Sequence, residues 1–373
     1  VVVREEDLGG IEHAFALKPD PVVAGETPAG EAAEGEGQTL ARSGSPTDEY
    51  QALRVLSLER SASLNASLSM LPDIEYVAEA IHSLDMAKLP SDDVQAILQQ
   101  FPTDREMASV LARDTPDALW DAPEGFILAL AAIPQCHARL RAMCLRREFG
   151  ERVRRVEKGS VSIREACRSV CSSQALRALC GATLTVGNFL NSKTLTRQSA
   201  AFSLHILPTL SKTIDADGSH SLLHHILSLC KAEAPHVFRL PLELSSLADA
   251  LPFTLSSLSD DLSALVSDLR DASVLCFRQE AKVPKKASRL LHQFIEVSED
   301  RLNTAASELA TAHDSFETLL LYLGEHELEL PFSSSSQACH SLIQSLHKVA
   351  LDVQEEIATN FKPNSGPSKS IAR

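Results

Sequence analysis

Leucine recurs at spacings of three and four residues between Leu255 and Leu269, and this pattern constrains the fold more than any other in the chain. The leucines stand at positions 255, 258, 262, 265 and 269, with mostly serine and aspartate between them. Such a heptad repeat places all five side chains on one face of an α-helix. Because it covers only about two heptads, it predicts antiparallel packing within the chain rather than a long autonomous coiled coil.

Helical spacing of apolar residues extends over most of the remaining sequence. It predicts helices over residues 49–71, 73–84, 91–100, 104–113, 123–133, 134–149, 175–186, 287–323 and 337–359. Ser91 and Thr103 precede acidic first turns, where their hydroxyl groups can cap free backbone N–H groups. Gly187 and Asn188 indicate a helix end after Val186. With only 5% aromatic residues and few β-branched runs, the chain is expected to be all-α.

Composition bounds the function before any motif is considered. The 373 residues carry a net charge of -15, which argues against nucleic acid as a partner because phosphate binding needs clustered Lys and Arg. The eight cysteines show no paired CxxC spacing, which favours reduced thiols and a cytoplasmic location. No apolar run reaches about 18 residues, so no membrane insertion is expected. The first residues, VVVREED, indicate a piece of a longer protein.

Two segments are predicted to lack a packed core. Residues 19–50 are rich in Pro, Gly and acidic residues and cannot bury enough apolar surface to offset the entropy of ordering. Composition alone leaves open whether they form a functional linker or a variable surface loop. Residues 362–373 form a basic tail that is predicted to be disordered.

Catalytic and metal-binding motifs are not found. His220 and His224 share a helix face where a metal ion could bind, but no HExxH motif or supporting carboxylate accompanies them, so a buried helix is the better interpretation. Cys167 and Cys171 have no histidine partner at a suitable spacing. The sequence contains no P-loop, GxGxxG or GxSxG motif. We therefore expect neither enzymatic activity nor a cofactor or bound metal.

Six segments, in order, resemble the formin homology-2 domain. The most specific is GNFLNSKTLTRQSAAFSLHILPTLSKTIDADGSHSLLHHIL, which begins at Gly187 and resembles the family's GNYxN segment and the helix that follows it. The others are IEHAFALK, LSLERSASLNASLSML, QQFPTDREM, PEGFILALAAIP and YLGEHELE. Together they span about residues 11 to 330, and their order makes them far more specific than any one of them.

The resemblance implies an elongated, multi-helix, all-α domain that forms a head-to-tail dimeric ring. Residues 1–18 would be the end of the lasso or the segment before the linker, 19–50 the flexible linker, 51–135 the knob, 136–330 the coiled-coil and post regions, 331–361 a C-terminal helix and 362–373 the tail. The post would present Gly187, Asn188, Phe189, Leu190 and Asn191 for dimerisation. Glycine there would let another backbone approach, and the asparagines would satisfy its polar groups. A helix cap at Gly187 and a turn at Asn188 remain the alternative interpretations.

Actin binding is the function that the resemblance implies, and the matching positions show departures from the family. The candidate actin-binding residues are Arg60, Ala66, Arg197, Phe202, Ser203 and Lys212. Ala66 stands where the family has an isoleucine that packs on actin, and Ser203, Thr209 and Ile214 stand where lysine is frequent. Arg60 has the alternative of a surface salt bridge. The family's lasso tryptophans are missing, since Trp120 is the only tryptophan, so this segment is expected to lack its lasso.

The resemblance therefore implies an actin-binding domain that nucleates filaments, processively caps barbed ends, or does both, as a cytoplasmic part of the cytoskeleton. Its partners would be actin, a second copy of the chain when the lasso is present, and profilin-actin through a proline-rich region outside this segment. The neutral residues at several basic positions leave an alternative, a formin-like dimerising scaffold with weak or lost actin-assembly activity. An unrelated helical adaptor would require the six ordered matches to be accidental.

Overall fold

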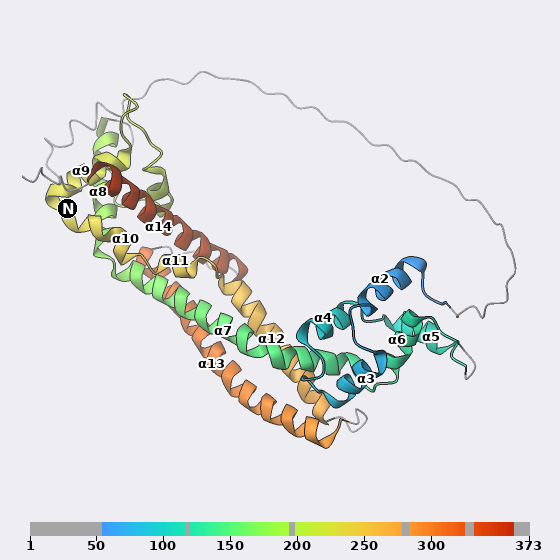
Figure 1. Cartoon of the computed structure of the whole chain (residues 1–373). Coiled ribbons are helices and arrows are strands. Elements are labelled where there is room, and N and C mark those ends of the chain that lie inside the picture. The colour runs from blue at the N-terminus through green and yellow to red at the C-terminus, as the bar shows by residue number, and fades with distance from the viewer. Residues whose placement is uncertain (1–53, 116–118, 194–197, 278–282, 325–331, 362–373) are drawn as a thin grey trace, which may run out of the picture. The chain divides into compact units, whose positions relative to one another are not determined.

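The computed structural model describes residues 54–115, 119–193, 198–277, 283–324 and 332–361, and these residues are almost entirely helical (Figure 1). Within them the β-structure is limited to isolated bridge residues, of which Ile214 and Ser221 pair with each other. The predicted all-α fold is confirmed. The predicted lasso end, linker and basic tail lie outside the described residues, as does Arg197. Among the helices described, none is both long and apolar enough to cross a bilayer.

The chain divides into two units, which we call the small unit and the large unit. The small unit contains the described residues up to 144 together with 272–292, and the large unit contains 145–271 and the residues from 293 onward. Three helices contribute to both units, namely α7 (Cys136–Ser172), α12 (Leu255–Phe277) and α13 (Lys285–Leu323).

The small unit is a cluster of short helices. They are α2 (Leu58–Leu68), α3 (Ile74–Ser83), α4 (Ser91–Gln99), α5 (Asp104–Leu111) and α6 (Ala122–Ala131). The cap predicted at Ser91 is wrong, because Ser91 is the first residue of its helix, and Pro90, which has no side-chain acceptor, stands at the cap position. The cap predicted at Thr103 is present as a capping box with Glu106. The helix predicted to begin at residue 49 begins at Leu58, where Ser57 accepts a hydrogen bond from the Arg60 N–H.

Two fully buried charged residues hold the loops of the small unit. Glu124 in the first turn of α6 accepts hydrogen bonds from the Val55 and Leu56 N–H groups at 2.9 and 3.2 Å. Arg139 donates to the Pro134 carbonyl at 2.9 Å and to the His82 carbonyl. A buried charge is tolerated only when such hydrogen bonds replace its hydration.

In the large unit, α7 packs against α12 and α13, and these two neighbours run in opposite directions. Its Arg152 and Arg155 pair with Asp268 and Asp261 of α12, so these two helices run antiparallel. The corresponding pairs with α13, Glu157–Arg301 and Arg164–Glu308, advance in the same direction, so these helices run parallel. In α12, Leu255, Leu258, Leu265 and Leu269 are buried and Leu262 is half-buried, as the heptad pattern predicts.

Helix α14 and several shorter helices complete the large unit, and all of them except η1 share one apolar core with α7 and α13. They are α8 (Gln174–Leu190), η1 (Asn191–Lys193), η2 (Leu204–Thr209), α9 (Leu222–Glu233), η3 (Pro235–Arg239), α10 (Leu240–Glu243), α11 (Leu247–Ala250) and α14 (Phe332–Asn360). Two predicted helix ends are wrong. Helix α7 continues 23 residues beyond Phe149 to Ser172, and α8 continues past Gly187 to Leu190.

The extension of α8 has a packing explanation. A glycine inside a helix costs about 1 kcal/mol relative to alanine. Phe189 and Leu190, which follow Gly187, pack against the apolar core, and this burial outweighs the local cost.

Candidate functional site

A pocket of about 200 Å³ opens beside the last turns of α8. Four segments form its wall, namely the end of α8, the chain from Ser199 to Phe202, the η2 region (residues 203–212) and the start of α9. It is lined by Thr183, Leu184, Val186, Gly187, Asn188, Asn191, Ser199, Ala201, Phe202, Ile206, Leu210, Leu222 and Ile226. We call it the α8 pocket. It brings together four of the predicted site residues, Gly187, Asn188, Asn191 and Phe202.

Gly187 leaves the wall of the α8 pocket open. A Cβ atom placed on it would meet no heavy atom within 4 Å, so the absence of a side chain is not required by packing inside this chain. Its conformation is that of an ordinary helical residue, since it lies within α8 and its φ is not positive. The glycine therefore matters to the shape of the pocket, where it allows a close approach from outside.

Asn188 is engaged by its own chain. Its Nδ2 donates to the Ser199 carbonyl at 2.9 Å, and its Oδ1 accepts from the Ser199 N–H at 2.8 Å. These paired bonds tie the segment after η1 back to α8. Within this chain the side chain therefore shapes the pocket wall, in addition to any contact with an incoming segment. Asn191 caps the helix through its backbone N–H, which donates to the carbonyl groups of Gly187 and Phe189.

Phe189 and Leu190 have a different position from the rest of the GNFLN motif. Both are half-buried and pack against the apolar core, and neither lines the α8 pocket. The motif therefore combines residues that form the pocket with residues that anchor α8.

The remaining predicted residues of the large unit lie beyond the pocket wall. Ser203 and Lys212 are exposed at the two ends of the η2 region. Thr209 is also exposed, and its hydroxyl group donates to the Ile206 carbonyl at 2.6 Å. Ile214 is 51% exposed. These positions can accept larger or charged side chains without entering the core.

Arg60 and Ala66 belong to helix α2 of the small unit. The Arg60 guanidinium pairs with Glu106 at 2.9 Å and donates to the Gln100 side chain and carbonyl at 2.6 and 2.9 Å. This geometry matches the salt-bridge alternative for Arg60. Ala66, by contrast, is exposed, and the same helix region exposes Leu58 and Met70. This face has apolar area but only a methyl group at position 66.

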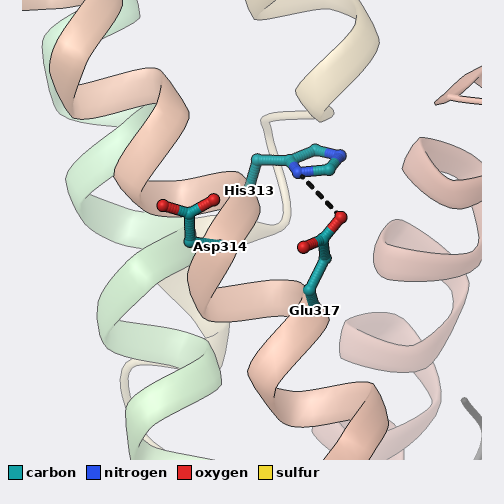
Figure 2. A group of neighbouring side chains, drawn as sticks. All are labelled: His313, Asp314 and Glu317. Carbon is teal, nitrogen blue, oxygen red and sulfur yellow. Dashed lines mark ion pairs between the residues drawn. The ribbon is translucent and has the colours of Figure 1, made fainter.

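One group of possible metal ligands lies on a single helix. Figure 2 shows His313, Asp314 and Glu317 of α13, whose ligand-forming atoms lie within 4.8 Å of one another. His313 Nδ1 is 3.4 Å from Glu317 Oε1, one helical turn away. Both carboxylates are exposed, and all three residues of the group come from α13. We interpret the group as a surface i,i+4 pair, which contributes about 0.2–0.5 kcal/mol.

Sequence reasoning missed the far wall of the α8 pocket. Leu222 and Ile226 come from α9, and Ile206 and Leu210 from the η2 region. Their helical spacing is that of ordinary core residues. Only the fold shows that they meet α8 around a cavity.

The helical fold and the α8 pocket define an all-α binding module. Residues 2–347 match the family described as Formin Homology 2 Domain, so this chain belongs to that family. It is 24% identical to Formin-like protein 21b of Arabidopsis thaliana, covering 74% of this chain and 68% of the relative. It is 25% identical to Formin-like protein 16 of Arabidopsis thaliana and 28% identical to a Formin-like protein of Drosophila melanogaster, over 87% and 68% of this chain. The chain spans 46% and 21%, respectively, of those two relatives.

Proposed function

We propose that this chain is the actin-assembly domain of a formin and that it acts as a head-to-tail dimer which nucleates filaments, processively caps barbed ends, or does both. The observation that carries the proposal is the α8 pocket, whose open wall at Gly187 lies within the region that matches Formin Homology 2 and in the segment whose sequence most specifically resembles that family. The activity is a binding activity, with actin and a second copy of the chain as partners.

The size and lining of the pocket fit one aromatic side chain of a partner segment. A cavity of roughly 150 Å³ admits a benzene ring, so the α8 pocket, at about 200 Å³, has room for one ring but not for a folded element. Leu184, Leu222 and Ile226 supply apolar wall, and Asn191 lies at the rim with an exposed side chain. This combination suits an aromatic anchor on an extended segment of the second subunit.

Actin contact is proposed for the exposed positions of α2 and the η2 region. Ala66, Ser203, Phe202 and Lys212 lie at or near the surface, whereas Arg60 is already bonded within the small unit. A cytoskeletal location in the cytoplasm, and recruitment of profilin-actin through a proline-rich region outside this segment, follow from the same proposal.

The test replaces Gly187 by leucine, with Gly181→Leu as the matched control. Both glycines lie inside α8 and have open space at the Cβ position, but only Gly187 lines the pocket. The protein carries its native upstream segment, so that a lasso is present. Sedimentation measures self-association, and fluorescence reports actin assembly from monomers.

We expect Gly187→Leu to weaken the dimer and slow actin assembly without any loss of thermal stability, since leucine has a higher helix propensity than glycine, while Gly181→Leu leaves self-association and assembly unchanged. A dimer of undiminished affinity in Gly187→Leu would contradict the role of the pocket. A wild-type protein that is dimeric but does not accelerate assembly would favour the scaffold function, which the neutral residues at Ala66, Ser203 and Thr209 already support.

A further inference from the structure

Three histidines and two carboxylates gather where the chain from Asp215 to Ser221 meets α9 and the last turns of α14. His225 Nε2 lies 3.3 Å from Asp215 Oδ2, and His220 Nδ1 lies 3.9 Å from the same oxygen. His224 Nδ1 lies 3.3 Å from Glu356 Oε2. None of these five residues lines the α8 pocket.

Asp215 is held in place by the turn that it opens. Its Oδ1 accepts from the Ser219 N–H at 2.8 Å and its Oδ2 from the His220 N–H at 3.2 Å. Its backbone N–H donates to the His220 carbonyl at 2.9 Å. The carboxylate is thereby fixed before any ligand arrives, and its side chain is only 6% exposed.

We propose that Asp215, His220 and His225 form a binding site for a divalent transition-metal ion such as Zn²⁺. Two imidazoles and one carboxylate are a ligand set that zinc accepts, with a fourth position left for water. Ligand atoms about 2.0–2.1 Å from a tetrahedral zinc lie about 3.3–3.4 Å apart. The Asp215–His225 separation of 3.3 Å already has this value, and the Asp215–His220 separation of 3.9 Å is about 0.5 Å longer. The His220 and His225 rings lie 6.0 Å apart between centroids, and the three ligand atoms do not all lie within 4.8 Å of one another, so the His220 ring has to swing toward His225 when the ion binds.

The exposure of the three ligands suits entry of an ion from solvent. His220 is 47% exposed and His225 is 23% exposed, so the more exposed ring is the one that has to move to complete the site. Burial opposes ionisation of Asp215, but hydrogen bonds from Ser219, His225 and His220 outweigh it and hold the pKa of the carboxyl below its ordinary value of 3.8.

His224 acts beside this site rather than in it. The Nδ1 atom of His224 lies against the Glu356 carboxylate. Glu356 also accepts hydrogen bonds from the Ser221 hydroxyl at 3.0 Å and from the Asn360 side chain at 2.7 Å. The His224 and His220 rings lie 4.3 Å apart between centroids, so His224 supports one face of His220. Sequence spacing predicted one buried helix for His220 and His224, whereas His220 lies before the start of α9 and is 47% exposed. The shared carboxylate, Asp215, comes from the preceding turn, which that spacing did not reveal.

Cysteine is not part of the proposed ligand set. Cys230 lies on α9 five residues after His225, but its side chain is buried in the apolar core of the large unit. The group on α13 around His313 differs because its ligands come from one exposed stretch of helix with no turn to fix a carboxylate.

The experiment is calorimetric titration of Zn²⁺ into the untagged chain under reducing conditions, followed by the visible spectrum of the Co²⁺ form. The variants are Asp215→Asn, which keeps an oxygen for the Ser219 N–H, and His220→Gln, which changes an exposed side chain. His313→Gln is the matched control, since it removes a half-buried histidine paired with a carboxylate elsewhere in the chain.

We expect one equivalent of Zn²⁺ to bind and the melting temperature to rise with zinc concentration. Asp215→Asn and His220→Gln each lower the affinity by more than about 100-fold, beyond the 10- to 100-fold effect of changes outside the ligand shell. His313→Gln keeps the affinity, and the Co²⁺ form shows tetrahedral bands without thiolate charge transfer. Absence of binding, binding that both ligand variants retain, or loss in His313→Gln would overturn the proposal.

Discussion

At the scale of single residues, the Arg60–Glu106 pair makes the stability of the small unit depend on pH. Burial opposes ionisation of Glu106, but hydrogen bonds from Thr103 and Arg60 outweigh it and hold the pKa of Glu106 below its ordinary value of 4.5. A carboxyl with a lowered folded-state pKa stabilises the fold above its unfolded pKa, and this contribution is lost as the pH falls through the lower folded value.

The variant Glu106→Gln isolates that charge, because glutamine at the same position can still serve the capping box. We expect it to lower stability by about 0.5–1.5 kcal/mol at neutral pH, from the loss of a charge-assisted hydrogen bond. The difference from wild type should shrink toward pH 3, as the wild-type carboxyl is protonated. Urea unfolding at both pH values measures it, and an equal difference at both would show that the charge contributes nothing.

Residue types could be predicted from the sequence, but their partners could not. The polar character of Asn188 and Arg60 suggested contacts with a partner molecule. In the fold, Asn188 is instead hydrogen-bonded to Ser199, and Arg60 is bonded to Gln100 and Glu106. The residues of these pairs are separated by 11 to 46 positions. Sequence spacing shows which residues share a helix face, but it does not show which distant loop packs against that face.

At the scale of helices, Gly159 sets the distance between α7 and α12. A Cβ atom placed there would lie 2.8 Å from both terminal carbons of Leu258 and 2.9 Å from a ring carbon of Phe253. Leu258 is fully buried, so its side chain would have to shift within the packed core. We expect Gly159→Ala to destabilise the large unit by about 1–3 kcal/mol, the usual cost of overpacking a core.

Gly150 in the same helix provides the control. A Cβ atom there would meet only the end of the Arg154 side chain, at 3.9 Å. Gly150→Ala should therefore raise stability by about 0.5–1 kcal/mol through helix propensity. Thermal or urea unfolding compares the two variants. A Gly159→Ala protein as stable as Gly150→Ala would show that the helices can separate without cost.

Helix existence was predictable and helix ends were less so. The heptad leucines of α12 and the Thr103 cap were read correctly because each signal is local. The predicted end before Gly187 failed because it relied on glycine as a helix breaker, and the predicted end at Phe149 failed because α7 continues through Gly150 and Gly159. In α7 the glycine at 159 is instead a contact surface for α12, and in α8 Gly187 forms the wall of a pocket. Both roles depend on a second element that local sequence does not reveal.

At the scale of the whole molecule, the net charge of -15 opposes association with an acidic partner such as the actin surface. The exposed positions Ser203 and Thr209 can carry compensating charge. We expect Ser203→Lys with Thr209→Lys to increase actin binding and the rate of assembly several-fold, and the gain to be larger at low salt. Screening shortens from about 30 Å at 0.01 M to about 10 Å at 0.1 M ionic strength, so the added lysines act over a shorter range at the higher salt.

The control is a double variant that adds the same charge elsewhere in the large unit, Ser263→Lys with Thr304→Lys, at two exposed helical positions. Actin-assembly rates at the two salt concentrations compare the pairs. If position matters, the variant at 203 and 209 gains more than the control, and the actin contact lies near the η2 region. Equal gains would show that only net charge changed the encounter rate. No gain in either variant, from a protein that is dimeric, would favour a scaffold that holds its partner subunit without assembling actin.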